Sequence, residues 1–273
     1  VLTLDSLAAD ATVELTANGD VEAVLEDATG ASDSLNAVVS TDTADLDAGT
    51  LTAADVETIN ITSSDNQLDN NGSGVNNAVE TNTLDLNADS ATSVVVTATG
   101  NAAMTVNGGS AGDVLTADGG NDVLNGGDGN DTLKGADLTE LTGGAGNDTF
   151  VMNAPSSVNG YSTITDLDVG DTIRLGDGDA TTTGTVEFSS SAVDLADTAV
   201  FQDYANKAVN DFGTDDDDAA WFQVGGNTYI VQSGNSTAGD DFVNGDDSII
   251  QIAGTVDLST ASYNQDAGTL EIA

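Results

Sequence analysis

GGSAGDVLTADGGNDVLNGGDGNDTLKGADLTELTGGAGNDTFV, residues 108–151, divides into nine-residue units of which the fourth, GADLTELT, is one residue short. In each full unit a glycine- or asparagine-rich turn ends in Asp, and a single apolar residue follows two positions later. The Asp series is Asp113, Asp122, Asp131 and Asp148, and the apolar series is Leu115, Leu124, Leu133 and Phe150. This spacing predicts a mainly β fold, a parallel β-roll or β-solenoid whose turns bind calcium.

Calcium suits these turns because it takes roughly six to eight oxygen ligands, and Asp carboxylates and backbone carbonyls supply such oxygens. Glycine permits the backbone angles that aim the carbonyls at an ion. One nonapeptide supplies half a coil, so two units form a coil of about eighteen residues, and neighbouring coils must stack to bury the apolar series. The predicted ligands in the repeats are Asp113, Asp131, Asp148, Asp122, Gly109, Gly126, Gly127, Asp128, Gly129, Gly143 and Ala145.

The predicted ligands fall on two edges of the roll. Turns ending at Asp113, Asp131 and Asp148 lie along one edge and define two calcium positions between them. The opposite edge pairs the turn ending at Asp122 with residues 135–140, where Glu140 stands at the Asp position and the third site is degenerate. A flexible linker rich in Gly, Asn and Asp is the alternative, but Asp and Leu recurring in phase favour the calcium motif.

The chain is strongly acidic. It has 47 Asp and Glu residues against three basic residues, Lys134, Arg174 and Lys207, and its net charge is −44. This charge excludes nucleic acid and anionic membranes as partners. It also implies that the chain needs cations to stay compact, so that ion binding becomes part of the folding free energy. General acidity for solubility or for high salt is the alternative explanation for part of the surplus.

Cysteine and histidine are both absent. Their absence removes disulfides, thiol nucleophiles, imidazole bases and the usual zinc ligands. A Ser/Lys or carboxylate-pair enzyme remains conceivable, but no sequence element marks a nucleophile, and we predict that the chain is not an enzyme. No apolar stretch is long enough to span a bilayer, so no membrane insertion is expected.

Three regions are predicted. Residues 1–107 alternate short β-prone runs with polar turns and continue in phase into the repeats at 108–151, which favours one β-solenoid over a separate β-sandwich. Residues 152–273 are predicted to form a cap and a small β-rich module. Acid clusters in the first region are more typical of solvated turns than of ligand sets; they contain Asp42, Asp45 and Asp47 before Gly49, and Asp65 and Asp69 before Gly72.

The segment STITDLDVGDTIRL at 162–175 has the pattern of a cap for the roll, because its apolar residues cover the last coil. Asp166 and Asp171 flank a tight turn at Gly170. They either complete the last row of calcium ligands or serve turn chemistry alone.

The last third of the chain contains the one segment in which apolar residues recur with the period of a helix. Residues 194–212 predict one helix that ends at Gly213. Gly225, Gly226 and Asn227 predict a hairpin between the strands at 221–224 and 228–232. Three aromatic residues of this hairpin are expected in a core rather than on a binding surface: Trp221, Phe222 and Tyr229.

The GGxGxD repeats, the segment TITDLDVGDTIRL and the ending from WFQVGGNTYIVQ to TLEIA together resemble the C-terminal regions of RTX proteins exported by type I secretion. The run VETINIT, then NTLDLNADSATSVVVTATG, the repeats and the hairpin are similar in order to surface-layer (S-layer) proteins of the Caulobacter type. The resemblance covers nearly the whole chain. Two departures are the degenerate GADLTE and Arg174, which stands where relatives frequently have an acidic residue.

This resemblance implies a secreted structural S-layer protein that folds with several calcium ions outside the cell and self-assembles into a two-dimensional lattice on the bacterial surface. It implies a C-terminal secretion signal within residues 152–273. The implied partners are copies of the chain itself, the type I export machinery, and cell-surface polysaccharide bound through a region before Val1. The alternative is that the chain is the calcium-folded secretion module of a larger secreted RTX enzyme or adhesin.

Overall fold

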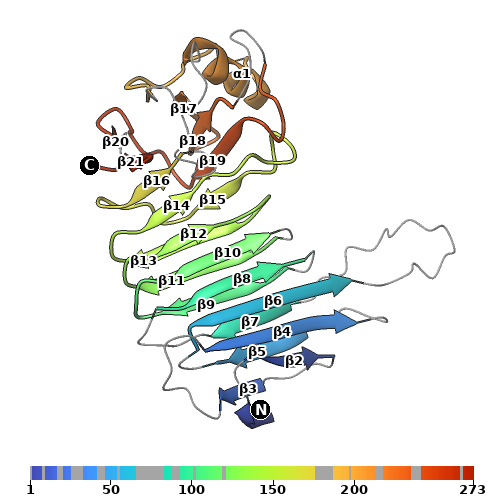
Figure 1. Ribbon diagram of the computed structural model, residues 1–273. Coiled ribbons are helices and arrows are strands. Elements are labelled where there is room, and N and C mark those ends of the chain that lie inside the picture. The colour runs from blue at the N-terminus through green and yellow to red at the C-terminus, as the bar shows by residue number, and fades with distance from the viewer. Residues whose placement is uncertain are drawn as a thin grey trace, which may run out of the picture. The chain divides into compact units, whose positions relative to one another are not determined.

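The computed structural model describes residues 2–7, 10–16, 21–25, 33–41, 47–53, 56–65, 83–87, 93–100, 103–118, 121–175, 187–196, 198–212, 218–234, 241–264 and 267–273. By its internal contacts the chain divides into two compact units, Val1–Thr132 (unit 1) and Leu133–Ala273 (unit 2). The described residues form strands and a single helix (Figure 1). The predicted mainly β class is therefore confirmed.

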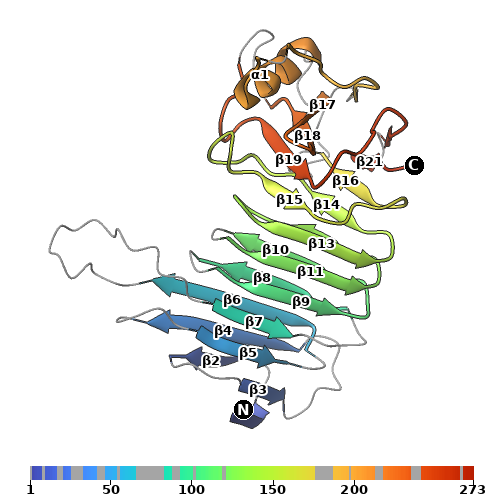
Figure 2. The same cartoon turned by 180° about the vertical axis from the view of Figure 1, so that it is seen from behind.

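Strands of unit 1 alternate between two parallel sheets, so that each strand pairs with the next but one along the chain (Figures 1 and 2). One sheet contains β1 (Leu2–Leu7), β3 (Val21–Leu25), β5 (Asp47–Thr52), β7 (Thr83–Asn87), β9 (Thr105–Gly109) and β11 (Val123–Asp128). The other contains β2 (Ala11–Leu15), β4 (Ser34–Thr41), β6 (Thr58–Asp65), β8 (Val95–Thr99) and β10 (Val114–Asp118). A short strand, β12 (Thr132–Lys134), spans the boundary between the units.

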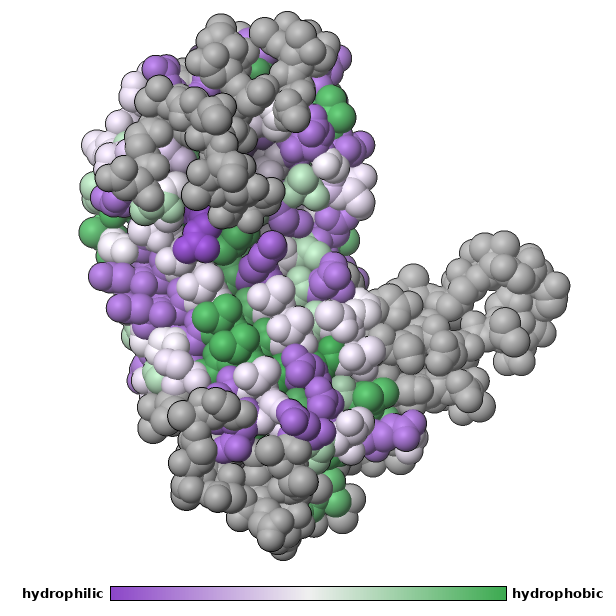
Figure 3. All heavy atoms as spheres, in the orientation of Figure 1, coloured by the Kyte–Doolittle hydropathy of each residue, from purple (hydrophilic) through white to green (hydrophobic). Residues whose placement is uncertain are grey.

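The register of these strands places apolar residues beside apolar residues of the neighbouring strand. Leu124 of β11 lies beside Val106 of β9, and Leu115 of β10 lies beside Val96 of β8; all four side chains are fully buried. Burial of one such side chain is worth roughly 1.5–3 kcal/mol, and it requires the neighbouring strands of the sheet. Along each strand, more exposed residues alternate with these buried ones. Figure 3 shows the outer surface, on which hydrophilic side chains are widespread and apolar ones form only small groups.

Unit 2 begins with the same arrangement and then changes direction. Parallel pairing joins β13 (Glu140–Ala145), β15 (Ser162–Ile164) and β19 (Ser248–Ile252), and antiparallel pairing adds β18 (Asn227–Gln232) and β17 (Ala219–Val224). In the second sheet β14 (Thr149–Val151) and β16 (Thr172–Arg174) are parallel, whereas β21 (Thr269–Glu271) and β20 (Ser262–Asn264) are antiparallel additions.

The helix α1 (Phe201–Phe212) packs against the hairpin β17–β18 (Figure 2). Both residues of the hairpin turn, Gly225 and Gly226, have positive φ (63° and 88°), as a two-residue turn of type I′ requires. Phe222 stacks on Tyr229, with ring centroids 5.2 Å apart, inside the apolar core that the helix covers. The predicted hairpin is confirmed, and all three of its predicted core aromatics are buried.

The predicted start of the helix is wrong, since α1 begins at residue 201 and not at 194. The preceding backbone is held by β17: Ser189 N–H donates to the Ala219 carbonyl (2.9 Å), and Val193 N–H donates to that of Trp221 (2.8 Å). The helix starts beyond this pairing, where the Asp203 carboxylate accepts a hydrogen bond from the Val200 N–H (2.9 Å). This is the half of a capping box that fixes a helix N-terminus.

The acid clusters predicted as turns lie partly in strands. Asp47 and Gly49 belong to β5, and Asp65 is the last residue of β6. The parallel partners of these strands override the turn preference of Asp and Gly. Asp42, Asp45, Asp69 and Gly72 lie outside the described residues.

Candidate metal centre

Two glycine-rich turns of unit 1, residues 108–113 and 126–131, stack directly on one another. Gly127 lies in register with Gly109, and a Cβ on Gly127 would collide with the Gly109 carbonyl oxygen. Gly127 and Gly129 also have φ values of 112° and 126°, which other residues rarely adopt. Alternate repeats therefore stack here, as predicted, with Gly127 beside Gly109 in the neighbouring strand.

Asp113 and Asp131 occupy equivalent positions, each immediately before a strand. Both are almost fully buried. Asp113 Oδ1 accepts a hydrogen bond from the Val94 N–H (2.8 Å), and Asp131 Oδ1 accepts one from the Asp113 N–H (2.7 Å). On the other edge, Asp122 Oδ1 accepts from the Met104 N–H in the same way (2.8 Å). Each carboxylate thus satisfies a backbone N–H that lies 18 or 19 residues earlier in the chain.

The second carboxylate oxygens of Asp113 and Asp122 are buried and have no hydrogen-bond partner. A Cβ on Gly108 would collide with both Asp113 Oδ2 and the carbonyl oxygen of Gly126, so these two oxygens face the same bare side of Gly108. Both oxygens are acceptors, and a cation between them would offset their mutual repulsion. A hard cation with oxygen ligands fits this cradle.

The electrostatics of both carboxylates agree with that fit. Burial raises the pKa of Asp113 above its ordinary value, against hydrogen bonds from backbone N–H groups. Burial, with a smaller contribution from the nearby Asp118 carboxylate, raises the pKa of Asp122 to about 6. The protein alone therefore destabilises the charged form of these groups, and a bound cation would restore it.

No protein-family model matches the chain, and no curated protein matches it either. The family resemblance consequently rests on the repeats and their flanking segments alone.

In unit 2 the last turn of the repeats is closed by hydrogen bonds. Both oxygens of Asp166 accept from the backbone, from the Gly143 N–H and the Gly144 N–H (2.9 Å each). Asp171 is buried and accepts from the Asp148 N–H (2.9 Å) and the Asp168 N–H (2.8 Å). These contacts are compatible with both roles predicted for Asp166 and Asp171, and a calcium row at this turn stays a prediction.

Asp148 itself is almost fully buried, and a Cβ on Gly143 would collide with its carboxylate. Its turn therefore has the compact form of the turns in unit 1. Asp171 has a pKa raised by burial and, to a lesser degree, by the charges of Asp166 and Asp168. Gly170 has a φ of 106°, which confirms the predicted tight turn.

The degenerate repeat differs from its prediction. Thr139, and not Glu140, holds the position of the buried Asp, because Thr139 is fully buried before β13 whereas Glu140 is exposed. The Thr139 carbonyl accepts from the Thr163 N–H (2.8 Å), as the Asp148 carbonyl does from Thr172. Glu140 is therefore no candidate ligand, and the missing residue of this unit lies before Thr139.

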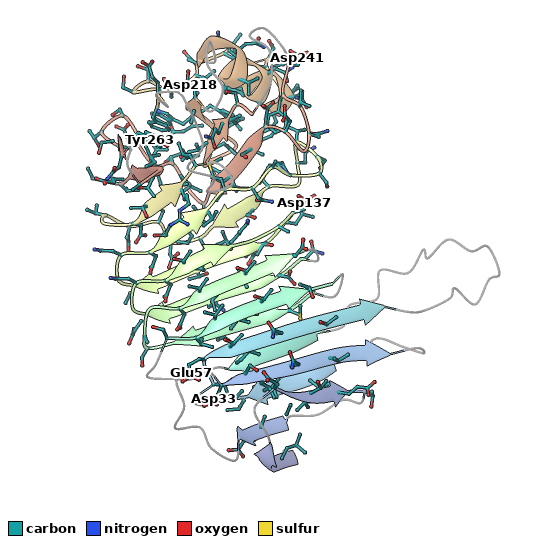
Figure 4. The ribbon with its side chains drawn as sticks, in the orientation of Figure 1. Asp33, Glu57, Asp137, Asp218, Asp241 and Tyr263 are labelled. Carbon is teal, nitrogen blue, oxygen red and sulfur yellow. The ribbon has the colours of Figure 1, made fainter. Side chains whose placement is uncertain are left out.

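Asp137, which the repeat pattern did not single out, has a structural task in this turn (Figure 4). Its two carboxylate oxygens accept from the Ser156 N–H (3.0 and 3.1 Å), and Oδ2 also accepts from the Ser156 hydroxyl. These contacts anchor the segment between β14 and β15 to the turn. Direct hydrogen bonds therefore stabilise this turn of the shortened unit, where Thr139 replaces the buried Asp.

The remaining predicted ligands are placed as follows. Gly126 is buried and offers the carbonyl described above, whereas Asp128 and Ala145 are exposed at the ends of β11 and β13. Among the residues that the structure describes, no three acidic side chains gather as a metal-ligand group. Backbone carbonyls would have to complete the coordination of any ion, as they do in glycine-rich calcium turns. In the same described part, no helix is long and apolar enough to cross a membrane.

Proposed function

We propose that the alternating strands form the coils of a parallel β-roll that calcium completes. The single observation that carries this proposal is the pair of buried, donor-free carboxylate oxygens on Asp113 and Asp122. The first of these and the Gly126 carbonyl oxygen both lie against the side of Gly108 where another residue would carry its Cβ. Asp113, Asp122, Asp131 and the turn carbonyls are the groups that would hold the ions.

Bound calcium supplies positive charge and oxygen coordination in these turns. The chain's own residues do the rest: the Asp carboxylates join successive coils through the backbone N–H groups, and the buried Leu series fills the interior. A net charge of −44 opposes compaction until cations bind. Ion binding would then contribute directly to folding, in a compartment where calcium is abundant.

The function that we propose is structural. Resemblance of the repeats and of both flanking segments to Caulobacter-type S-layer proteins supports a secreted protein that assembles into a lattice on the bacterial surface. Heterologous contacts between copies of an acidic chain can propagate without closing, provided that cations reduce the repulsion. The C-terminal region would carry the export signal, and cell-surface polysaccharide would be a further partner.

Electron microscopy of the purified chain tests the assembly. We expect ordered sheets in millimolar calcium and none in excess chelator or in magnesium at equal ionic strength. Circular dichroism of the same samples tests the folding, and we expect the cooperative β transition only with calcium. A folded chain that stays monomeric in calcium would contradict the lattice and favour the secretion module of a larger protein. An unchanged β spectrum in chelator would contradict the calcium-completed roll.

A further inference from the structure

The row of positions that contains Asp113 continues toward the N-terminus, beyond the nonapeptides. Ser34 pairs with Thr58, Thr58 with Val95, and Val95 with Val114. The residues immediately before these four strands therefore form one rung across the sheet. They are Asp33, Glu57, Val94 and Asp113.

Asp33 and Glu57 repeat the contact that Val94 and Asp113 make. Asp33 N–H donates to Glu57 Oε2 (2.9 Å), just as Val94 N–H donates to Asp113 Oδ1. The Asp33 carbonyl accepts from the Thr58 N–H (3.0 Å), as the Val94 carbonyl does from Val114 (2.9 Å). Figure 4 shows Asp33 and Glu57 together where β4 and β6 begin. The acidic rung is thus built in a region that has no glycine-rich repeat.

Asp33 is buried, with 8% of its surface exposed, and its Oδ2 has no hydrogen-bond partner. A second carboxylate, that of Glu57, touches its backbone, and a third, that of Asp10, accepts a hydrogen bond from the neighbouring Ser34 hydroxyl. Residues 1–132 contain no Lys, Arg or His, so the sequence of this unit offers no side-chain cation to neutralise the group. A buried anion of this kind needs a counter-charge from outside the unit.

We propose that Asp33 and Glu57 form a divalent-cation site of the calcium type. Both donors are hard oxygens, which select calcium or magnesium over softer metals, and the two carboxylates come from successive coils. A cation held there joins β4 to β6 at the rung. This site is independent of the nonapeptide turns, because it shares no residue with them.

Equilibrium dialysis with calcium tests the site on the whole chain. Asp33→Asn and Glu57→Gln both keep a hydrogen-bonding side chain of nearly unchanged shape, and each should lower the bound calcium by one ion per chain. The matched control is Glu14→Gln, which removes an equal charge from the exposed face of β2 and should leave the count unchanged. Unaltered counts in both test variants, with circular dichroism like the parent's, would overturn the proposal.

Hydrogen exchange locates the effect and separates it from the nonapeptides. In the parent chain, calcium should slow exchange in peptides covering 33–41 and 56–62, and Asp33→Asn should abolish that slowing while residues 123–134 still respond. Asp131→Asn should do the reverse. Calcium-dependent protection of 33–41 that survives in Asp33→Asn refutes the new site. A lost ion in Asp33→Asn but not in Asp131→Asn would support it while contradicting calcium in the repeats.

Discussion

Replacing Asp113 separates two contributions of one side chain, its hydrogen bond and its charge. Asp113→Ala removes the acceptor of the buried Val94 N–H and the donor-free oxygen together, whereas Asp113→Asn keeps a carbonyl oxygen at the first position. Hydrogen bonds to charged groups are worth about 1.5–3 kcal/mol, and an unmet buried N–H costs a similar amount. We therefore expect Asp113→Ala to be less stable than Asp113→Asn by about 2 kcal/mol.

Calcium titration followed by circular dichroism measures this difference without requiring a folded calcium-free state. If two ions are coupled to folding, a loss of about 2 kcal/mol raises the calcium midpoint roughly fivefold. The expected order of midpoints is parent lowest, Asp113→Asn higher and Asp113→Ala highest, with Glu14→Gln equal to the parent. Identical midpoints for the Asn and Ala variants would refute the role of the hydrogen bond. Midpoints equal to the parent's in both would refute Asp113 as a ligand.

Three further predictions follow from the turns and the cap. Gly127→Ala should lower the free energy of unfolding by about 2–3 kcal/mol, because it strains a positive φ and brings a Cβ against a backbone carbonyl. Gly225→Ala, where nothing lies near the added Cβ, should cost only about 1 kcal/mol. Denaturant titrations in calcium measure both values. Because the pKa of Asp122 is raised to about 6, protonation of its carboxylate competes with calcium binding. Calcium affinity should therefore fall as pH decreases from 7 to 5, and calcium binding should release protons. Calorimetry measures both effects, and the contribution of Asp122 to each should be absent in Asp122→Asn. Asp166→Ala removes the hydrogen bonds to Gly143 and Gly144 and should speed hydrogen exchange in peptides covering 140–145. Asp168→Ala, at an exposed position, should not change this exchange. Equal exchange rates in both variants would contradict the role of Asp166 in holding the turn.

The sequence predicted the strands and the repeating Asp because both follow a fixed rule of spacing. It located the turns before β10, β11, β12 and β14, since in each an apolar residue follows Asp by two positions. The same rule, applied backward from Leu141, identifies Thr139; counting forward through the shortened unit led to Glu140 instead. Buried apolar positions thus mark the register better than the glycines do.

The Asp33–Glu57 rung was not found because the sequence before these two residues does not follow the glycine pattern of the nonapeptides. The signal was present in a weaker form: Asp33 precedes the buried Leu35 by two positions, and Glu57 precedes the buried Ile59 by two. Acidic residues at such spacing are common in acidic chains, so only the register of β4 and β6 distinguishes this pair. The start of α1 could not be predicted either, because the spacing of apolar residues does not reveal that the preceding backbone pairs with β17.

Most of the carboxylate contacts between successive turns run in one direction. In the pairs 33–57, 94–113, 104–122 and 148–171 the donor N–H belongs to the earlier residue and the accepting Asp or Glu to the later one, whereas Asp137 accepts from the later residue Ser156. Removing a coil from the C-terminal side of such a pair leaves a buried N–H unmet, whereas removing the N-terminal partner leaves only a carboxylate that water or an ion can serve. The two members of such a pair are thus unequal as sites of truncation. Shortened or extended versions of this protein should keep their last coil and vary the first.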